Sequence, residues 1–84
     1  KNAARTFHKE MIQLANDALE QIPQELRDIS TITATLSFDG FSKLKNKMTE
    51  FRNEILKIVQ EEKNATGVYH LNFHLFPISK TLQD

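Results

Sequence analysis

The sequence predicts an α+β fold, or a small α/β fold, in the order helix, strand, helix, strand. Two apolar stripes with helical spacing predict the helices. Two segments in which apolar and polar residues alternate, from about Ile29 to Phe38 and from about Val68 to Phe76, predict the strands. Strands joined by a helix are normally parallel with a right-handed crossover, so we expect a two-stranded sheet with both helices on one face.

The first predicted helix runs from about Ala3 to Ile22. Its apolar residues recur at spacings of three and four and form one stripe: Phe7, Met11, Leu14, Ala15, Ala18, Leu19 and Ile22. Pro23 is expected to end the helix, because proline lacks the backbone donor that a helix interior requires.

Each predicted strand has an apolar face and a polar face. The apolar faces hold Ile32, Ala34, Leu36 and Phe38 in the first strand and Tyr69, Leu71, Phe73 and Leu75 in the second. We expect the helices to cover these faces, with a core of Leu14, Leu19, Ile32, Leu36, Phe51, Ile55, Leu71 and Phe73. The polar face carries Thr31, Thr33, Thr35, His70, Asn72 and His74, which we predict as a possible interface.

The second predicted helix begins near Asp39, a plausible N-cap. An apolar seam follows with spacings of three and four: Phe41, Leu44, Met48, Phe51, Ile55 and Ile58. This seam suits a helix packed on a sheet, and also a contact with a helix of a second chain.

The charges of this predicted helix oppose its dipole, with Lys43, Lys45 and Lys47 near the N-terminus and Glu61 and Glu62 near the C-terminus. They indicate either a solvated surface or an acidic partner near the lysines.

A two-stranded parallel sheet is rarely stable alone, so we expect a partner to complete it. The partner is either a second copy of the chain or an N-terminal part of the same protein. Residues 1–84 are expected to form a single domain, and the start at Lys1 suggests a C-terminal fragment of a longer protein.

Composition argues against several classes of function. There are 11 basic and 11 acidic residues, so the basic excess usual in nucleic-acid-binding domains is absent. The chain has no cysteine and no apolar run that could span a membrane. His70 and His74 would lie about 13 Å apart along a strand, too far to share one metal ion. We predict no catalytic residues, no metal, no cofactor and no enzymatic activity, because no nucleophile-and-base pair or glycine-rich phosphate loop is evident.

Three stretches resemble one known family: residues 27–37 (RDISTITATLS), 50–56 (EFRNEIL) and 68–79 (VYHLNFHLFPIS), together with the helix from Phe7 to Leu19. They are similar to the C-terminal domain of a bacterial family of unknown function, whose longer members look like winged-helix transcriptional regulators. The resemblance implies a regulator's C-terminal module, with DNA contact in another part of the protein. It brings no functional residues with it.

The predicted function is therefore a non-catalytic regulatory or oligomerisation domain of a cytoplasmic bacterial transcriptional regulator. This fragment itself is expected to contact neither nucleic acid nor membrane. Two other classes of function stay open. One is a small-molecule-sensing domain, and the other is a small enzyme whose site is shared between subunits.

Overall fold

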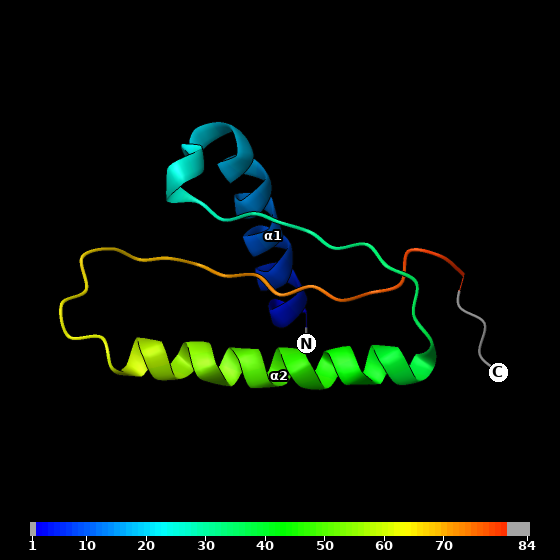
Figure 1. The fold of residues 1–84 in the computed structure, drawn as a ribbon. Helices are drawn as coiled ribbons and strands as arrows, with labels where there is room; N and C mark the ends of the chain where they lie inside the picture. The colour runs from blue at the N-terminus through cyan, green and yellow to red at the C-terminus, as the bar shows by residue number, and fades with distance from the viewer. Residues whose placement is uncertain (1, 81–84) are drawn as a thin grey trace. The chain divides into compact units, whose positions relative to one another are not determined.

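The computed structural model of the protein describes residues 2–80. These residues form two α-helices, α1 (Ala3–Gln21) and α2 (Phe38–Gln60), and a short 3-10 helix, η1 (Gln24–Leu26) (Figure 1). None of the described residues lies in a β-strand. The predicted α+β fold with a two-stranded sheet is therefore wrong, and the regular structure of the described chain is entirely helical.

The two segments with strand-like alternation are extended connections instead. Within residues 2–80, the backbone hydrogen bonds outside the helices are short-range turns and helix caps, and no ladder forms. The side chain of Ile32 is 94% exposed and that of Val68 is fully exposed. Alternation favours extended backbone, but a strand also needs a neighbour to satisfy its amides and carbonyls. Nothing in the described chain supplies one.

Helix α1 confirms the first predicted helix to within one residue. It ends at Gln21, and Ile22 at the C-cap has extended backbone angles of φ −108° and ψ 128°. Pro23 follows directly and begins the turn into η1. The amide of Ile22 still donates a hydrogen bond to the carbonyl of Ala18, which closes the last turn.

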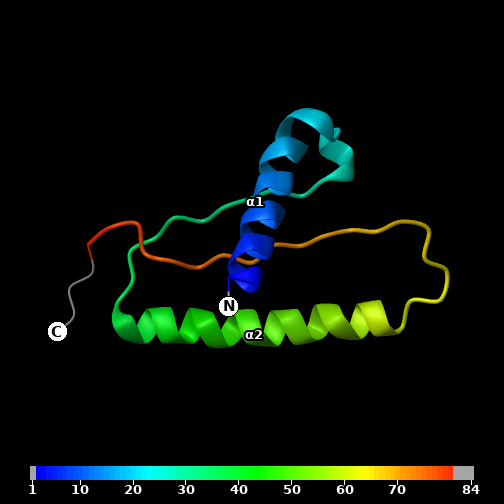
Figure 2. The ribbon, with the colours of Figure 1, turned by 180° about the vertical axis from the view of Figure 1, so that it is seen from behind.

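Helix α2 begins one residue earlier than predicted, and both ribbon views show it as one continuous helix (Figures 1 and 2). Its N-cap is Ser37, whose Oγ accepts a hydrogen bond from the amide of Gly40 at 3.0 Å. The prediction of Asp39 as N-cap is therefore wrong, because Asp39 already lies in the first helical turn. Its carboxylate is still well placed there, since an acidic group is favourable at the positive end of the helix dipole.

The chain divides into two compact units. One contains α1, η1 and residues 70–72, and the other contains α2 with the segments next to it in sequence and residues 73–80. In the second unit the ring of Phe73 packs edge-on against Phe51, with centroids 5.8 Å apart. The prediction of a single domain over residues 1–84 stays a prediction.

No described residue is fully buried. Of the predicted core, Ile55 and Phe73 are half-buried, and the others are exposed: Leu14, Leu19, Ile32, Leu36, Phe51 and Leu71. The predicted core is therefore wrong as a buried cluster. Its sheet component does not form, so the apolar stripes of the helices have little to pack against.

Candidate functional site

The six residues predicted as a polar interface do not share a sheet face, because the sheet is absent from the described chain. Five of them are exposed: Thr31, Thr33, Thr35, His70 and His74. Asn72 is half-buried. The structure brings only His70 and Asn72 of this set into a hydrogen bond, with His70 Nε2 and Asn72 Oδ1 2.8 Å apart. Whether the six residues form an interface stays a prediction.

His70 and Asn72 hold the extended chain on the middle of α1. The Asn72 Nδ2 donates to the carbonyl of Met11 at 3.0 Å, and the His70 ring lies edge-on to the Phe7 ring with centroids 6.3 Å apart. Since the Oδ1 of Asn72 can only accept, the Nε2 of His70 must carry the proton in their hydrogen bond. Phe7 and Met11 therefore belong to this site. The interpretation of residues 68–76 as a strand did not include these two residues.

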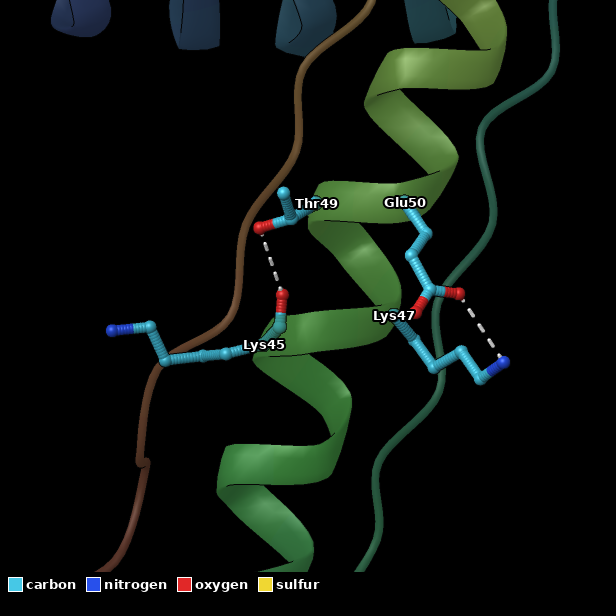
Figure 3. Close-up of polar contacts among 4 residues, drawn as sticks. All are labelled: Lys45, Lys47, Thr49 and Glu50. Carbon is cyan, nitrogen blue, oxygen red and sulfur yellow. Dashed lines mark hydrogen bonds and ion pairs between the residues drawn. The ribbon is translucent and has the colours of Figure 1, made fainter.

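The lysines near the start of α2 each have a local interaction. Lys43 lies 3.3 Å from the Asp39 carboxylate, and Lys47 lies 3.3 Å from the Glu50 carboxylate. The ammonium of Lys45 lies 5.9 Å from the centre of the Phe41 ring, a cation–π distance. Figure 3 shows Lys45 and Lys47 pointing to opposite sides of α2. The lysines thus form no continuous basic stripe.

A short polar chain links two further turns of α2. The hydroxyl of Thr49 donates to the carbonyl of Lys45 at 3.2 Å, and Arg52 donates to the same hydroxyl at 3.4 Å (Figure 3 shows the first contact). These bonds are exposed and span three or four residues. They support the helix locally and bring together no group capable of acid–base chemistry.

The members of the predicted apolar seam of α2 alternate between half-buried and exposed. Alternate members are half-buried in the second unit: Phe41, Met48 and Ile55. The members between them are more open, with Leu44 39%, Phe51 49% and Ile58 65% exposed. We call Leu44, Phe51 and Ile58 the exposed stripe. Its side chains recur every seven residues along α2 and remain partly accessible.

Among residues 2–80, no group of three or more histidine, aspartate or glutamate side chains is placed to hold a metal ion. Neither described α-helix combines the length and the apolar character needed to cross a bilayer.

Comparison with known proteins places the chain in a family. Neither the curated proteins nor the solved structures contain a match. One family model, described as "Domain of unknown function (DUF4423)", matches residues 1–78, which include both α-helices and both extended segments. The chain therefore belongs to the DUF4423 family of domains of unknown function.

Proposed function

We propose that this chain is a non-catalytic regulatory and oligomerisation domain that pairs with a second copy of itself. The observation that carries the proposal is the exposure of the apolar helix surfaces, with no described residue fully buried. Contiguous apolar surface on a folded chain marks an interaction site more often than a solvent-facing surface.

Energetics support a partner. A domain of this size is marginally stable even with a complete core, because it buries only about 60% of the surface of its unfolded chain. Each large apolar side chain moved from water into an interface contributes about 1.5–3 kcal/mol. This chain has half-exposed leucine, isoleucine and phenylalanine side chains. Burying them against a partner would therefore stabilise the folded chain substantially.

We further propose that the domain serves a cytoplasmic bacterial transcriptional regulator whose DNA contacts lie in another part of the protein. The resemblance of residues 27–37, 50–56 and 68–79 to the C-terminal domains of such proteins supports this assignment. The balance of 11 basic and 11 acidic residues is consistent with it, since such a module needs no phosphate-binding surface of its own.

Sedimentation equilibrium over micromolar to submillimolar concentrations tests self-association directly. We expect the mean mass to rise from monomer toward dimer as concentration increases. A monomer at every concentration would refute the oligomerisation function.

A cellular assay tests whether the chain can dimerise a DNA-binding domain and so control transcription. The chain is fused to a DNA-binding domain that represses a reporter only as a dimer. We expect repression by the fusion and none by the DNA-binding domain alone. Equal reporter expression from the two, at equal protein levels, would contradict the proposal.

A further inference from the structure

The exposed stripe of α2 has a spacing suited to a helix-to-helix contact. Leu44, Phe51 and Ile58 are seven residues apart, so each lies about 20° around the helix from the one before it. All three are accessible while the neighbouring seam residues are partly covered within the second unit. The stripe is therefore a straight apolar line along most of the helix.

Four charged residues run beside this stripe on one side, and we call them the charged flank: Lys43, Lys47, Glu54 and Glu61. At 100° per residue, they lie about 40–80° from Phe51 in the same direction around the helix. The flank is basic in the first half of α2 and acidic toward its end. The end turns of α2 suit the helix dipole, with Asp39 in the first turn and Lys57 in the last, so the reversed order belongs to the flank alone.

Contacts within the chain account for only part of the charged flank. Lys43 and Lys47 pair with Asp39 and Glu50, but the side chains in these pairs are 61–78% exposed. Exposed pairs of this kind contribute little and exchange partners readily. The ion pairs of the described residues do not include Glu54 or Glu61. The acidic end of the flank thus stays open to a basic partner.

We propose that a second copy of the chain docks on the exposed stripe with the two α2 helices antiparallel. This inference rests on the proposed self-association and specifies its surface. A two-fold axis near Phe51 places that ring against the partner's Phe51 and places Leu44 opposite the partner's Ile58. In antiparallel helices the same flank of each helix meets, so Lys47 faces the partner's Glu54 and Lys43 faces the partner's Glu61. Each pair occurs twice by symmetry.

The charges favour this orientation over a parallel one. In a parallel pair, residues beside the seam meet residues of the opposite flank about five positions further along, so Lys47 would face the partner's Arg52. That contact joins like charges. The antiparallel pair also sets the helix dipoles in opposition and brings the partner's carboxylates to the lysine-rich half of α2. The charge order of the flank then has a physical reason.

Charge reversal tests the contact. The Lys47→Glu variant turns two attractive pairs into repulsive ones, and we expect the dimer dissociation constant to rise about tenfold or more at low salt. Adding Glu54→Lys in the same chain restores opposite charges across the antiparallel interface. We expect this double variant to regain most of the affinity, which also shows that the Lys47→Glu chain is not simply misfolded. Reversal of Lys57, which lies outside the charged flank, to Glu is the matched control and should change the affinity less than threefold.

Engineered cysteines test the orientation, and the chain has no cysteine of its own to interfere. An antiparallel pair should form a disulfide when Leu44→Cys and Ile58→Cys chains are mixed under mild oxidation. Either variant alone should give little cross-linked dimer. Cross-linking of Leu44→Cys with itself as efficiently as in the mixture would indicate parallel helices and overturn the inference.

The outcomes separate this inference from the broader function. A dimer whose affinity is unchanged by Lys47→Glu overturns the α2 interface and leaves self-association standing. A chain that is monomeric throughout overturns both. A dimer that is weakened by Lys47→Glu, recovered by the double variant and cross-linked only in the cysteine mixture supports the antiparallel interface.

Discussion

Ser37 and Asp39 show how a displacement of two residues changes the role of a side chain. Either residue could cap a helix, because both carry an oxygen that accepts from a free amide. Ser37 has the extended backbone of an N-cap, with φ −79° and ψ 170°, and its hydroxyl reaches the amide of Gly40. Asp39 instead acts from within the first turn, through the helix dipole and its 3.3 Å pair with Lys43.

We predict that Ser37→Ala lowers the free energy of unfolding by about 1 kcal/mol, because the capping hydrogen bond to Gly40 is lost. Ser37→Asp should retain most of the stability. Asp39→Asn should cost only a few tenths of a kcal/mol, since it removes an exposed charge interaction and no cap. Urea titrations followed by circular dichroism at 222 nm measure all three, and a larger loss for Asp39→Asn than for Ser37→Ala would reinstate Asp39 as the cap.

A second prediction at this scale concerns Asn72. Its Nδ2 donates to the carbonyl of Met11, and its Oδ1 accepts from His70. Asn72→Ala should lower the free energy of unfolding by about 0.5–1.5 kcal/mol through loss of these bonds. Asn72→Asp should cost more, because a carboxylate oxygen would then face the carbonyl oxygen of Met11. The control is Asn64→Asp at an exposed position, and equal losses in the two aspartate variants would contradict the role of Asn72.

At the scale of elements, the helices and the strands differ in what makes them predictable. A helix satisfies its backbone within itself, so the stripe from Phe7 to Ile22 and the stop at Pro23 were enough to locate α1. The alternation around Ile32 indicated extended backbone but could not provide a neighbouring strand. The contact between Asn72 and Met11 joins residues 61 positions apart, and no local pattern reports such a distance. The predicted polar face therefore grouped Asn72 with His74. It left out Met11 and Phe7, the residues of α1 that contact Asn72 and His70.

The contact between Phe51 and Phe73 gives a prediction at this scale. Full burial would make Phe73→Ala cost about 3–5 kcal/mol. Because Phe73 is half-buried and Phe51 is 49% exposed, we expect a loss of about 1–2 kcal/mol in the free energy of unfolding. A double-mutant cycle with Phe51→Ala should give a coupling of about 0.5–1.5 kcal/mol for the edge-on pair. Phe76, 64% exposed, is the control, and a loss for Phe76→Ala as large as for Phe73→Ala would speak against the contact.

At the scale of the whole molecule, the described chain has amphipathic helices without a buried core. Polar residues contribute specific contacts: the N-cap at Ser37 and the docking of Asn72 on α1. The large apolar residues stay half-covered or exposed. Burying them would add to the stability of the chain. The self-association proposed above would cover part of this surface.

The final prediction is that this chain does not bind DNA or RNA measurably at physiological salt. Affinity for phosphate backbones comes mainly from clustered basic residues that release counterions, and the formal net charge here is zero. The lysines near the start of α2 form no continuous basic stripe, since Lys45 points to the opposite side from Lys47 (Figure 3) and carboxylates lie 3.3 Å from Lys43 and Lys47. Fluorescence anisotropy with mixed-sequence duplexes and single strands, at about 150 mM salt, should show no saturable binding at micromolar protein. A variant with Glu50, Glu54 and Glu61 changed to lysine serves as the positive control, because it converts this side of α2 into a basic stripe and should bind in a salt-sensitive manner. Sequence-selective binding by the unmodified chain with a dissociation constant below about one micromolar would contradict this prediction and show that these residues contact DNA directly.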